Sequence, residues 1–311
     1  MPLAKIHDLL AQQTQRQDTF LTSSGSSALI AALQISGLPR GSEILMPSIC
    51  CPVVLFAIQL AGYKCTLADV SSATFNSELE HYKNAMSART RAIVAVHGFG
   101  KPCAIDEIET FAKANDLLLI EDACLALGGN FQGRALGSFG DISVVSFGYD
   151  KPVTINYGGA LMTNRDDLST AARAYLSRNE FMQYTAEPGM TDDLYASLTR
   201  LPEYVQERIS NVSAIQTTLT SKRITQPDTG ENTAFWRYPV VFDGDRDALV
   251  AAAREQDLLF TMHYRTLASL MTEAECPNAQ FISDHVLNIF VRPNTGRDDI
   301  MAKVEFLNSY A

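Results

Sequence analysis

The stretch Leu117-Leu118-Leu119-Ile120-Glu121-Asp122-Ala123 decides the fold, because a short apolar run between helical segments is typical of a buried parallel strand. It ends in two adjacent carboxylates, and strand alternation predicts that Glu121 and Asp122 point to opposite sides of the sheet. An unpaired carboxylate beside an apolar run is costly, so Asp122 needs a partner. A protonated ring nitrogen, the N-terminus of a helix or a metal ion would each meet that need.

Apolar runs alternate with helical segments on both sides of this stretch. After a short N-terminal helix, we expect strands at 43–46, 64–70, 92–96, 117–120 and 142–147, and helices at 26–35, 52–62, 77–88 and 105–115. This alternation predicts an α/β fold with a mainly parallel sheet covered by helices on both faces. Ligands of such sheets bind beyond the carboxyl ends of the strands. His97, Asp122 and Lys151 lie at or just past such ends.

The pattern changes after Lys151. An apolar patch at 158–162 leads to helices at 166–178 and 194–220. Further on we expect strands at 236–242, 259–264 and 287–291, and helices at 246–256, 281–286 and 298–309. The sequence therefore predicts a large domain over residues 1–220 and a smaller C-terminal α/β domain over residues 221–311.

A lysine follows a later strand in Ser146-Phe147-Gly148-Tyr149-Asp150-Lys151. An acid closing one strand and a lysine beyond another is the arrangement that a pyridoxal phosphate enzyme needs. The lysine holds the aldehyde of the cofactor as a Schiff base, and the carboxylate pairs with the protonated ring nitrogen. A surface lysine on a loop is the alternative for Lys151, and this segment alone leaves it open.

The segment Ser24-Gly25-Ser26-Ser27 precedes the expected helix at 26–35. Free N–H groups and the helix dipole make such a terminus a site for a phosphate, and glycine allows the anion to approach closely. Ser146 could add a hydroxyl to the same phosphate. The alternative is an ordinary serine N-cap, which needs no ligand.

Composition excludes several classes of protein. The formal net charge is −10 and no Lys/Arg cluster occurs, which argues against nucleic-acid binding. No apolar run approaches the roughly 20 residues of a membrane span, and the N-terminus lacks the apolar core of a signal peptide. The six cysteines lack zinc-type spacing, so we expect no metal and reduced thiols in a cytoplasmic protein. His97 is expected to be a structural hydrogen-bonding residue, and Gly158-Gly159 a tight turn.

The motifs occur together in an order that resembles a known family. The segments are Ser24-Gly25-Ser26-Ser27-Ala28-Leu29, Met46-Pro47-Ser48, His97-Gly98-Phe99-Gly100, Ile120-Glu121-Asp122-Ala123, Gly137-Ser138-Phe139-Gly140-Asp141, Ser146-Phe147…Lys151 and Gly158-Gly159, with looser matches at His263-Tyr264 and Pro277-Asn278-Ala279. They resemble the DegT/StrS family of pyridoxal phosphate aminotransferases, which mostly act on keto sugars attached to nucleotides.

The resemblance implies the aspartate-aminotransferase type of fold (fold type I) and a homodimer with its active site at the subunit interface. It makes Lys151 the Schiff-base lysine and Asp122 the partner of the ring nitrogen. It implies that Ser26 and Ser27, through their backbone amides, and Ser146, through its hydroxyl, hold the phosphate of pyridoxal 5′-phosphate.

The chain departs from the family pattern at three places. Leu125 stands where the family has a glutamine, and Ile49-Cys50-Cys51 lacks the aromatic residue that stacks on the cofactor ring. Glu187-Pro188-Gly189 replaces an Asn-x-Arg segment that reaches the neighbouring subunit. These losses weaken the expectation of a nucleotide-sugar substrate. With Arg265 and Arg292 as weak candidates to bind a diphosphate, they predict a smaller or less phosphorylated acceptor.

The leading hypothesis is an aminotransferase that moves an amino group from an amino acid donor to a carbonyl acceptor, a keto sugar or a related intermediate. A second keeps the cofactor but changes the reaction to elimination, replacement or decarboxylation, because Leu125 and Glu187–Gly189 alter the pocket. A third is a degenerate, non-catalytic homologue. Lys151 and Asp122 count against the third, since a binding role does not require that pair.

Overall fold

The computed structural model describes residues 3–187, 189–230, 233–271 and 274–310. Its largest feature is a seven-stranded sheet with the order β1-β9-β8-β5-β4-β2-β3. The strands are β1 (Asp18–Thr22), β2 (Glu43–Pro47), β3 (Lys64–Ala68), β4 (Thr90–Val96), β5 (Leu118–Asp122), β8 (Ile142–Ser146) and β9 (Gly159–Thr163). Neighbouring strands from β8 through β3 pair in parallel, while β9 pairs antiparallel with both β8 and β1. The predicted α/β fold with a mainly parallel sheet is confirmed.

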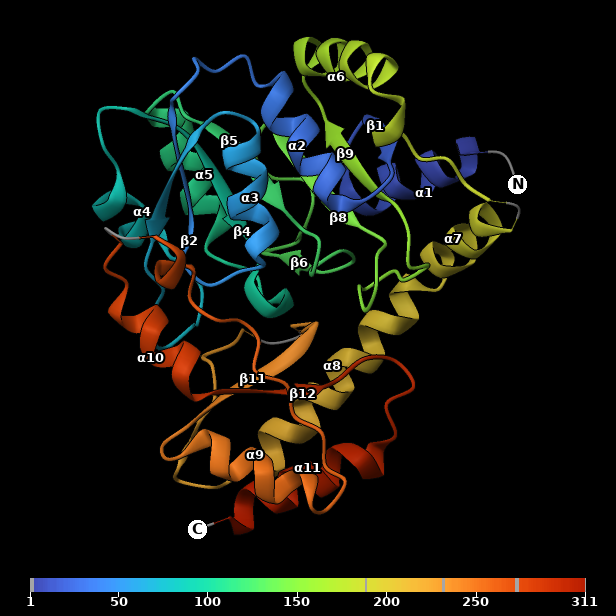
Figure 1. The fold of residues 1–311 in the computed structure, drawn as a ribbon. Helices are drawn as coiled ribbons and strands as arrows, with labels where there is room; N and C mark the ends of the chain where they lie inside the picture. The colour runs from blue at the N-terminus through green and yellow to red at the C-terminus, as the bar shows by residue number, and fades with distance from the viewer. Residues whose placement is uncertain (1–2, 188, 231–232, 272–273, 311) are drawn as a thin grey trace.

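Helices cover both faces of this sheet (Figure 1). They are α1 (Leu3–Thr14), α2 (Gly25–Ile35), α3 (Pro52–Leu60), α4 (Leu79–Ala85), α5 (Ile105–Ala114), α6 (Asp166–Arg178) and α7 (Met190–Thr199). Buried side chains of α2, α3 and α6 form one apolar cluster with one face of the sheet, while those of α4 and α5, and of α1 and α7, form clusters on the other face. Short connecting elements are η1 (Gly98–Gly100), η2 (Glu180–Met182) and the hairpin of β6 (Asn130–Phe131) and β7 (Arg134–Ala135).

Alternation along the strands decides which side chains face α2. Ile120 and Val144 belong to the cluster under α2 and α3, whereas Leu119 belongs to the cluster under α5. Successive residues of a strand point to opposite faces. Asp122 and Ser146, two residues beyond Ile120 and Val144, therefore face α2 from the carboxyl ends of neighbouring strands.

A second, three-stranded antiparallel sheet has the order β10-β11-β12. Its elements are β10 (Ile224–Thr225), β11 (Arg237–Phe242), β12 (Val286–Phe290), α9 (Arg246–Arg254), η3 (Leu267–Leu270), α10 (Pro277–His285) and α11 (Arg297–Ser309). The long helix α8 (Leu201–Thr218) runs from the large sheet to the small one (Figure 1). The exact domain boundary at residue 220 stays a prediction.

Two predicted elements are wrong. The single helix expected at 194–220 is divided into α7 and α8 at Arg200, because Pro202 in the first turn of α8 lacks the N–H that would continue the ladder. The strand expected at 259–264 is an extended segment with one isolated bridge, between Thr261 and Asn288. There the Asn288 side chain accepts a hydrogen bond from the backbone N–H of His263 in place of a continuous ladder.

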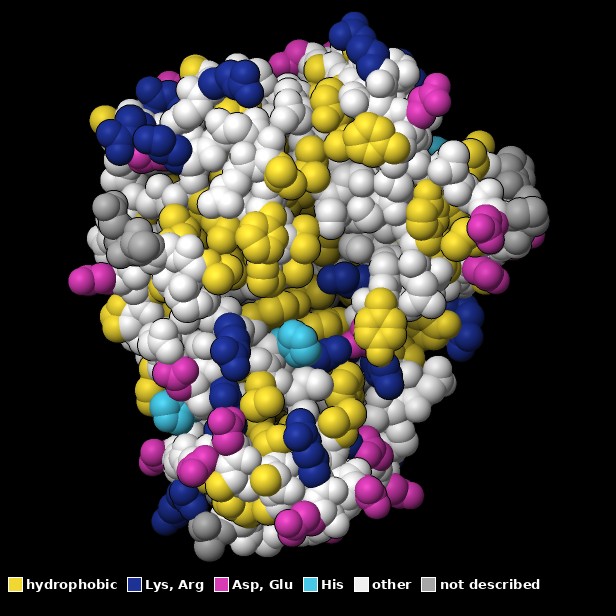
Figure 2. Space-filling view, in the orientation of Figure 1, with side chains coloured by type: hydrophobic (Ala, Val, Ile, Leu, Met, Phe, Trp, Pro, Cys, Tyr) yellow, Lys and Arg dark blue, Asp and Glu magenta, His cyan; other side chains and the backbone are white. Residues whose placement is uncertain are grey.

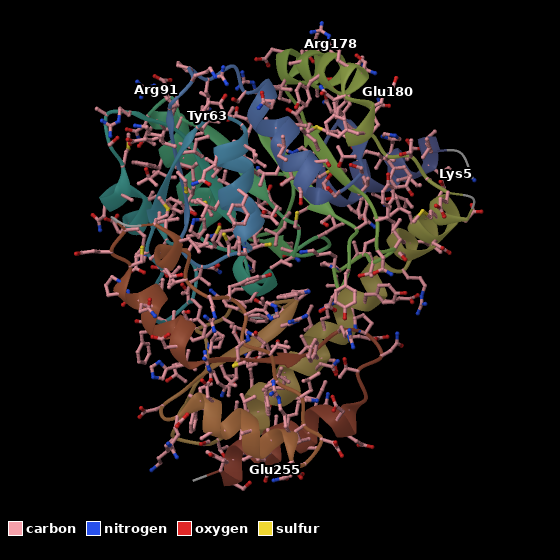
Figure 3. The ribbon with its side chains drawn as sticks, in the orientation of Figure 1. Lys5, Tyr63, Arg91, Arg178, Glu180 and Glu255 are labelled. Carbon is pink, nitrogen blue, oxygen red and sulfur yellow. The ribbon has the colours of Figure 1, made fainter. Side chains whose placement is uncertain are left out.

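Side chains fill the space between sheet and helices, and the labelled Arg91, Arg178 and Glu255 lie at the periphery (Figure 3). Within the described ranges, no helix combines the length and apolar character needed to cross a membrane.

Candidate functional site

Asp122 lies at the carboxyl end of β5 and is 7% exposed. Its Oδ1 accepts a hydrogen bond of 3.0 Å from the backbone N–H of Cys124, and the Cys124 thiol also hydrogen-bonds to this carboxylate. Within the described part of the chain, no group of three or more His, Cys, Asp and Glu side chains is placed to hold a metal ion. Asp122 is thus capped by the backbone of the turn that follows β5, and it remains the carboxylate at the carboxyl end of this strand on the face of α2.

The groups around Asp122 are neutral. Burial, and then the charge of Asp122, raise the pKa values of the Cys50 and Cys124 thiols well above their usual range. Burial likewise raises the pKa of Tyr264. Because thiolates are absent at neutral pH, these cysteines do not compete with a lysine amine as nucleophiles.

Ser146 and the start of α2 approach each other very closely. A Cβ atom added to Gly25 would lie 2.6 Å from Ser146 Cβ, 3.0 Å from Ser146 Oγ and 3.3 Å from Cys124 Sγ. Gly159 of β9 also allows the start of α2 to pack closely on the sheet, since a Cβ there would lie 2.6 Å from the backbone N of Gly25. The two glycines thus seat the N-terminus of α2 directly against the strand ends.

The hydrogen bonds at the N-terminus of α2 distinguish the two backbone amides, those of Ser26 and Ser27, that were predicted to hold a phosphate. Ser24 is the N-cap, and its Oγ accepts from the backbone N–H of Ser27 at 3.0 Å. The backbone N–H of Ser26 makes no hydrogen bond to any described residue. The serine N-cap is therefore present, the amide of Ser27 is engaged in it, and the amide of Ser26 is left without a partner among the described residues.

Lys151 lies in the loop between β8 and β9. Thr154 Oγ1 accepts from its backbone N–H at 2.9 Å and donates to its carbonyl at 2.6 Å, which holds the loop in shape. The Nζ atom lies 5.9 Å from the ring centre of Trp236, and its charge interacts with Cys124. Lys151 is thus brought to the same strand ends as Asp122 and Ser146, with its side chain half-buried.

Sequence reasoning missed an ionic cluster beside the lysine. Asp150, immediately before Lys151, accepts from Arg237 at 2.5 Å (Nη2 to Oδ2) and faces Arg292 at 3.5 Å (Nη1 to Oδ1). Trp236 Nε1 donates to the carbonyl of Asp150. Local signals existed, because Asp150 is adjacent to Lys151 and Trp236 is the only tryptophan of the chain. No sequence spacing, however, predicted that Asp150 and Trp236 lie together in the fold.

His263 and Tyr264 lie beside Arg237 and Trp236. Tyr264 stacks on Trp236 with ring centres 5.9 Å apart. His263 Nδ1 lies 2.9 Å from Arg237 Nη1, and because the arginine can only donate, that nitrogen is the acceptor. Burial and the charge of Arg237 lower the pKa of His263, so the ring is neutral at pH 7.

His97 and Glu121 form a separate, fully buried network on the other face of the sheet. His97 Nε2 lies 2.9 Å from Glu121 Oε1, and the glutamate also accepts from the backbone N–H groups of Gly137 and Phe139, each at 2.7 Å. Burial lowers the pKa of His97, but Cys103 and Glu121 outweigh it and raise that pKa to about 10. The structural role predicted for His97 and the opposite orientation of Glu121 are both confirmed.

The departures from the family pattern fall around the site. Leu125 is buried in the apolar core, so no polar group is present at that position. Cys51, the N-cap residue of α3, is half-buried, and it offers no aromatic ring at this position. Of the third departure, Pro188 lies outside the described residues.

Figure 2 shows a hollow across the middle of the molecule, where Figure 1 in the same orientation draws the space between the large sheet and the small one. Hydrophobic side chains gather around it, and Lys or Arg and His side chains lie at its rim. The hollow is therefore apolar at its centre and cationic at its edge.

Comparison with known proteins matches this geometry. Residues 4–307 match the model of the DegT/DnrJ/EryC1/StrS aminotransferase family. The aminotransferase TlmJ from Streptoalloteichus hindustanus has the same fold, with a TM-score of 0.89 at 23% identity, covering 99% of this chain and 90% of that one. An E. coli GDP-4-keto-6-deoxy-D-mannose-3-dehydratase with bound hydrated PLP superposes with a TM-score of 0.87 at 18% identity, covering 97% and 91%.

Curated relatives match over about half of the chain. The GDP-perosamine synthase of Escherichia coli O157:H7 is 32% identical over 162 residues, which are 52% of this chain and 44% of that protein. The dTDP-4-dehydro-2,6-dideoxy-D-glucose 3-dehydratase of Saccharopolyspora spinosa is 34% identical over 157 residues, 48% of this chain and 34% of that protein. The matched part thus spans less than half the length of these relatives. By its nearly full-length match, the chain belongs to the DegT/DnrJ/EryC1/StrS aminotransferase family.

Proposed function

We propose that this chain is a pyridoxal phosphate-dependent aminotransferase that moves an amino group from an amino acid donor to a carbonyl acceptor, a keto sugar or a related biosynthetic intermediate. One observation carries the proposal. The Gly25–Ser146 contact, the buried carboxylate of Asp122 and the amine of Lys151 meet at the carboxyl ends of β5 and β8. The combination of a close approach of a helix N-terminus, a carboxylate and an amine supports the proposal.

The residues present fit the cofactor. The cradle at Gly25, the backbone N–H of Ser26 and the hydroxyl of Ser146 would hold its phosphate, helped by the dipole of α2. Ser27 would contribute through its hydroxyl, which lies 2.8 Å from that of Ser23. The Asp122 carboxylate would pair with the protonated ring nitrogen. Lys151 would bind the aldehyde.

Bound pyridoxal phosphate would supply an electron-withdrawing ring that makes the α-carbon proton of the donor acidic. Lys151 Nζ, released when the donor binds, would take that proton and return it as general acid. Asp122 would keep the ring nitrogen charged throughout, which stabilises negative charge developing at the α-carbon. The stacked Trp236 and Tyr264 would exclude water from this side of the site.

Amino-donor titration of the purified, cofactor-loaded protein tests the proposal. We expect one or more amino acids to convert the visible absorbance band of the lysine-bound pyridoxal form into the shorter-wavelength band of the aminated form. An acceptor then restores the first band. If no amino acid converts the band, the aminotransferase proposal is wrong.

An elimination reaction is the second candidate, because some relatives are named 3-dehydratases. The donor titration does not separate the two reactions, because both use the aminated cofactor. A dehydratase would remove water from a deoxysugar, and the amino group of the cofactor would leave as ammonia instead of staying in the product. Analysis of the product by mass spectrometry distinguishes a gained amino group from a lost hydroxyl. A protein that binds cofactor but does neither would support the degenerate homologue.

The close contact between Gly25 and Ser146, called the Gly25 cradle below, leads to a separate prediction. Gly25→Ala should weaken pyridoxal phosphate binding about tenfold or more, because overpacking of a tight contact costs about 1–3 kcal/mol and 1.4 kcal/mol is tenfold. Gly296→Ala is the matched control, since a Cβ there meets nothing within 4 Å. Cofactor dissociation constants and melting temperatures of both apo variants should be measured. Equal affinity in the two variants would argue against the cradle.

We also propose a homodimer of cytoplasmic protein with small-molecule substrates and two domains that meet near residue 220. Val53, Phe56 and Leu60 on α3 are exposed, at 38%, 49% and 74%. Apolar residues on a surface beside a site favour burial by a second subunit. The two separate sheets, joined by α8, support the domain division.

The expectation of a smaller or less phosphorylated acceptor rested on the missing Asn-x-Arg segment and ring-stacking aromatic residue, with Arg265 and Arg292 as the cations that remained. The structure adds Arg237 and Arg208 near Lys151, so positive charge at the site is greater than the sequence indicated. The names of the curated relatives include nucleotide sugars as substrates or products. A phosphorylated keto sugar therefore remains within the proposal.

A further inference from the structure

A cavity of about 340 Å³ lies beside Lys151, on the side of the loop that faces α8 and the end of β12. We call it the Arg292 pocket, after the arginine at its rim. Its charged lining residues are Lys151, Arg208, Arg292 and Asp150. Three cations thus surround one carboxylate in a protein whose formal net charge is −10.

The carboxylate is already engaged. Asp150 Oδ2 accepts from both Nε and Nη2 of Arg237, a residue that lies outside the pocket lining. Arg237 is held in place by stacking on Trp236, with its guanidinium carbon 4.1 Å from the ring centre. Asp150 therefore neutralises Arg237 first and leaves the cations of the pocket in excess.

Arg208 is buried without a full set of partners. It is 3% exposed, and its Nη1 donates to the carbonyls of Phe235 and Trp236. Its Nε has no hydrogen-bond partner among the described residues. Burial, against the partial compensation of Asp150, lowers the pKa of this guanidinium to about 10. A buried cation with an unmet donor is stabilised when an anion approaches.

Arg292 is the more exposed of the two arginines. Its side chain is 49% exposed, and its contact with Asp150 Oδ1 is long, at 3.5 Å. A guanidinium in this state can turn to a new oxyanion at little cost, and such charge-assisted bonds are among the strong hydrogen bonds of proteins.

We propose that the Arg292 pocket binds an oxyanion of the substrate: a carboxylate of the amino donor or a phosphate of the acceptor. Arg292 forms the charge-assisted bond, and Arg208 supplies the buried positive potential behind it. The identity of the ligand as a substrate group rests on the proposed function, whereas the pocket itself rests on these four residues. Because Asp150 precedes Lys151 directly, the pocket would anchor a substrate within reach of the lysine.

The test measures anion binding by the fluorescence of Trp236, the only tryptophan of the chain. Cofactor-loaded wild-type protein, in which the Gly25 cradle is filled, is titrated with inorganic phosphate, succinate and guanosine diphosphate at low ionic strength. The variants are Arg292→Gln and, as a matched control, Arg254→Gln, which removes an exposed arginine at the end of α9 that is not in this pocket. Melting temperatures check that both variants are folded.

We expect Arg292→Gln to raise the dissociation constant of the bound anion about tenfold, the size of one charge-assisted hydrogen bond. Arg254→Gln should leave it unchanged. Tighter binding of succinate assigns the pocket to the donor carboxylate, and tighter binding of phosphate or guanosine diphosphate assigns it to the acceptor. Equal constants in wild type and Arg292→Gln, equal losses in both variants, or no binding of any probe would overturn the pocket.

The result of the anion-binding titration does not depend on the result of the amino-donor titration. If that titration fails while anion binding still depends on Arg292, the proposed function is wrong and the pocket stands. If the cofactor is aminated normally but Arg292→Gln has no effect on anion binding, the pocket is wrong and the proposed function stands.

Discussion

Replacing Lys151 with alanine should abolish turnover and covalent attachment of the cofactor together. The amine is the one group placed both to bind the aldehyde and to move the α-proton, and loss of a general acid–base group alone costs about 10²–10⁴ in rate. Borohydride reduction of the wild-type protein, followed by peptide mapping, should place the cofactor mass on Lys151. The same treatment of Lys151→Ala should leave the chain unlabelled.

Lys151→Arg is the matched control. It keeps a cation near Trp236, so it retains the electrostatics of the site, but a guanidinium does not condense with the aldehyde at neutral pH. Both variants should be folded, because Lys151 is held through its backbone by Thr154. Label on Lys101, a buried residue after η1, or near-normal turnover by either variant would contradict the assignment.

Asp122→Asn should lower the turnover rate by about 10²-fold or more while leaving the fold intact. The amide preserves the shape and can still accept the hydrogen bond from Cys124, but it carries no charge to hold the proton on the ring nitrogen. Loss of one preorganised electrostatic contact to a developing charge costs about 10²–10³ in rate. Single-turnover rates with saturating cofactor measure the effect separately from affinity.

The neighbouring carboxylate provides the control. Glu121→Gln makes the same chemical change one residue earlier, on the opposite face of the sheet. It disrupts a buried pair with His97, which costs about 3–5 kcal/mol of stability when one partner is removed. We expect a lower melting temperature with a normal rate per folded molecule. If Asp122→Asn lowered only stability and Glu121→Gln only the rate, the two roles would have to be exchanged.

Much of the large sheet could be predicted from local pattern. Strand alternation separated Asp122 from Glu121 before any contact was known, because the period of a strand is a property of its backbone. The same reasoning failed where a single residue overrode the pattern, as Pro202 does between α7 and α8. It failed again at 259–264, where the Asn288 side chain replaces a strand ladder.

The sequence by itself determined the α/β class, the order of the motifs and the position of Asp122, Ser146 and Lys151 at strand ends, since periodicity and turn residues act over a few neighbours. Only the tertiary structure showed that Gly25 packs on Ser146, and that Arg237 and Arg292 reach Asp150 from the second sheet. These contacts join segments far apart in the chain, and they depend on how two sheets and α8 pack together. No local pattern carries that information, because the packing of side chains and the pairing of buried charges depend on residues that are distant in the sequence.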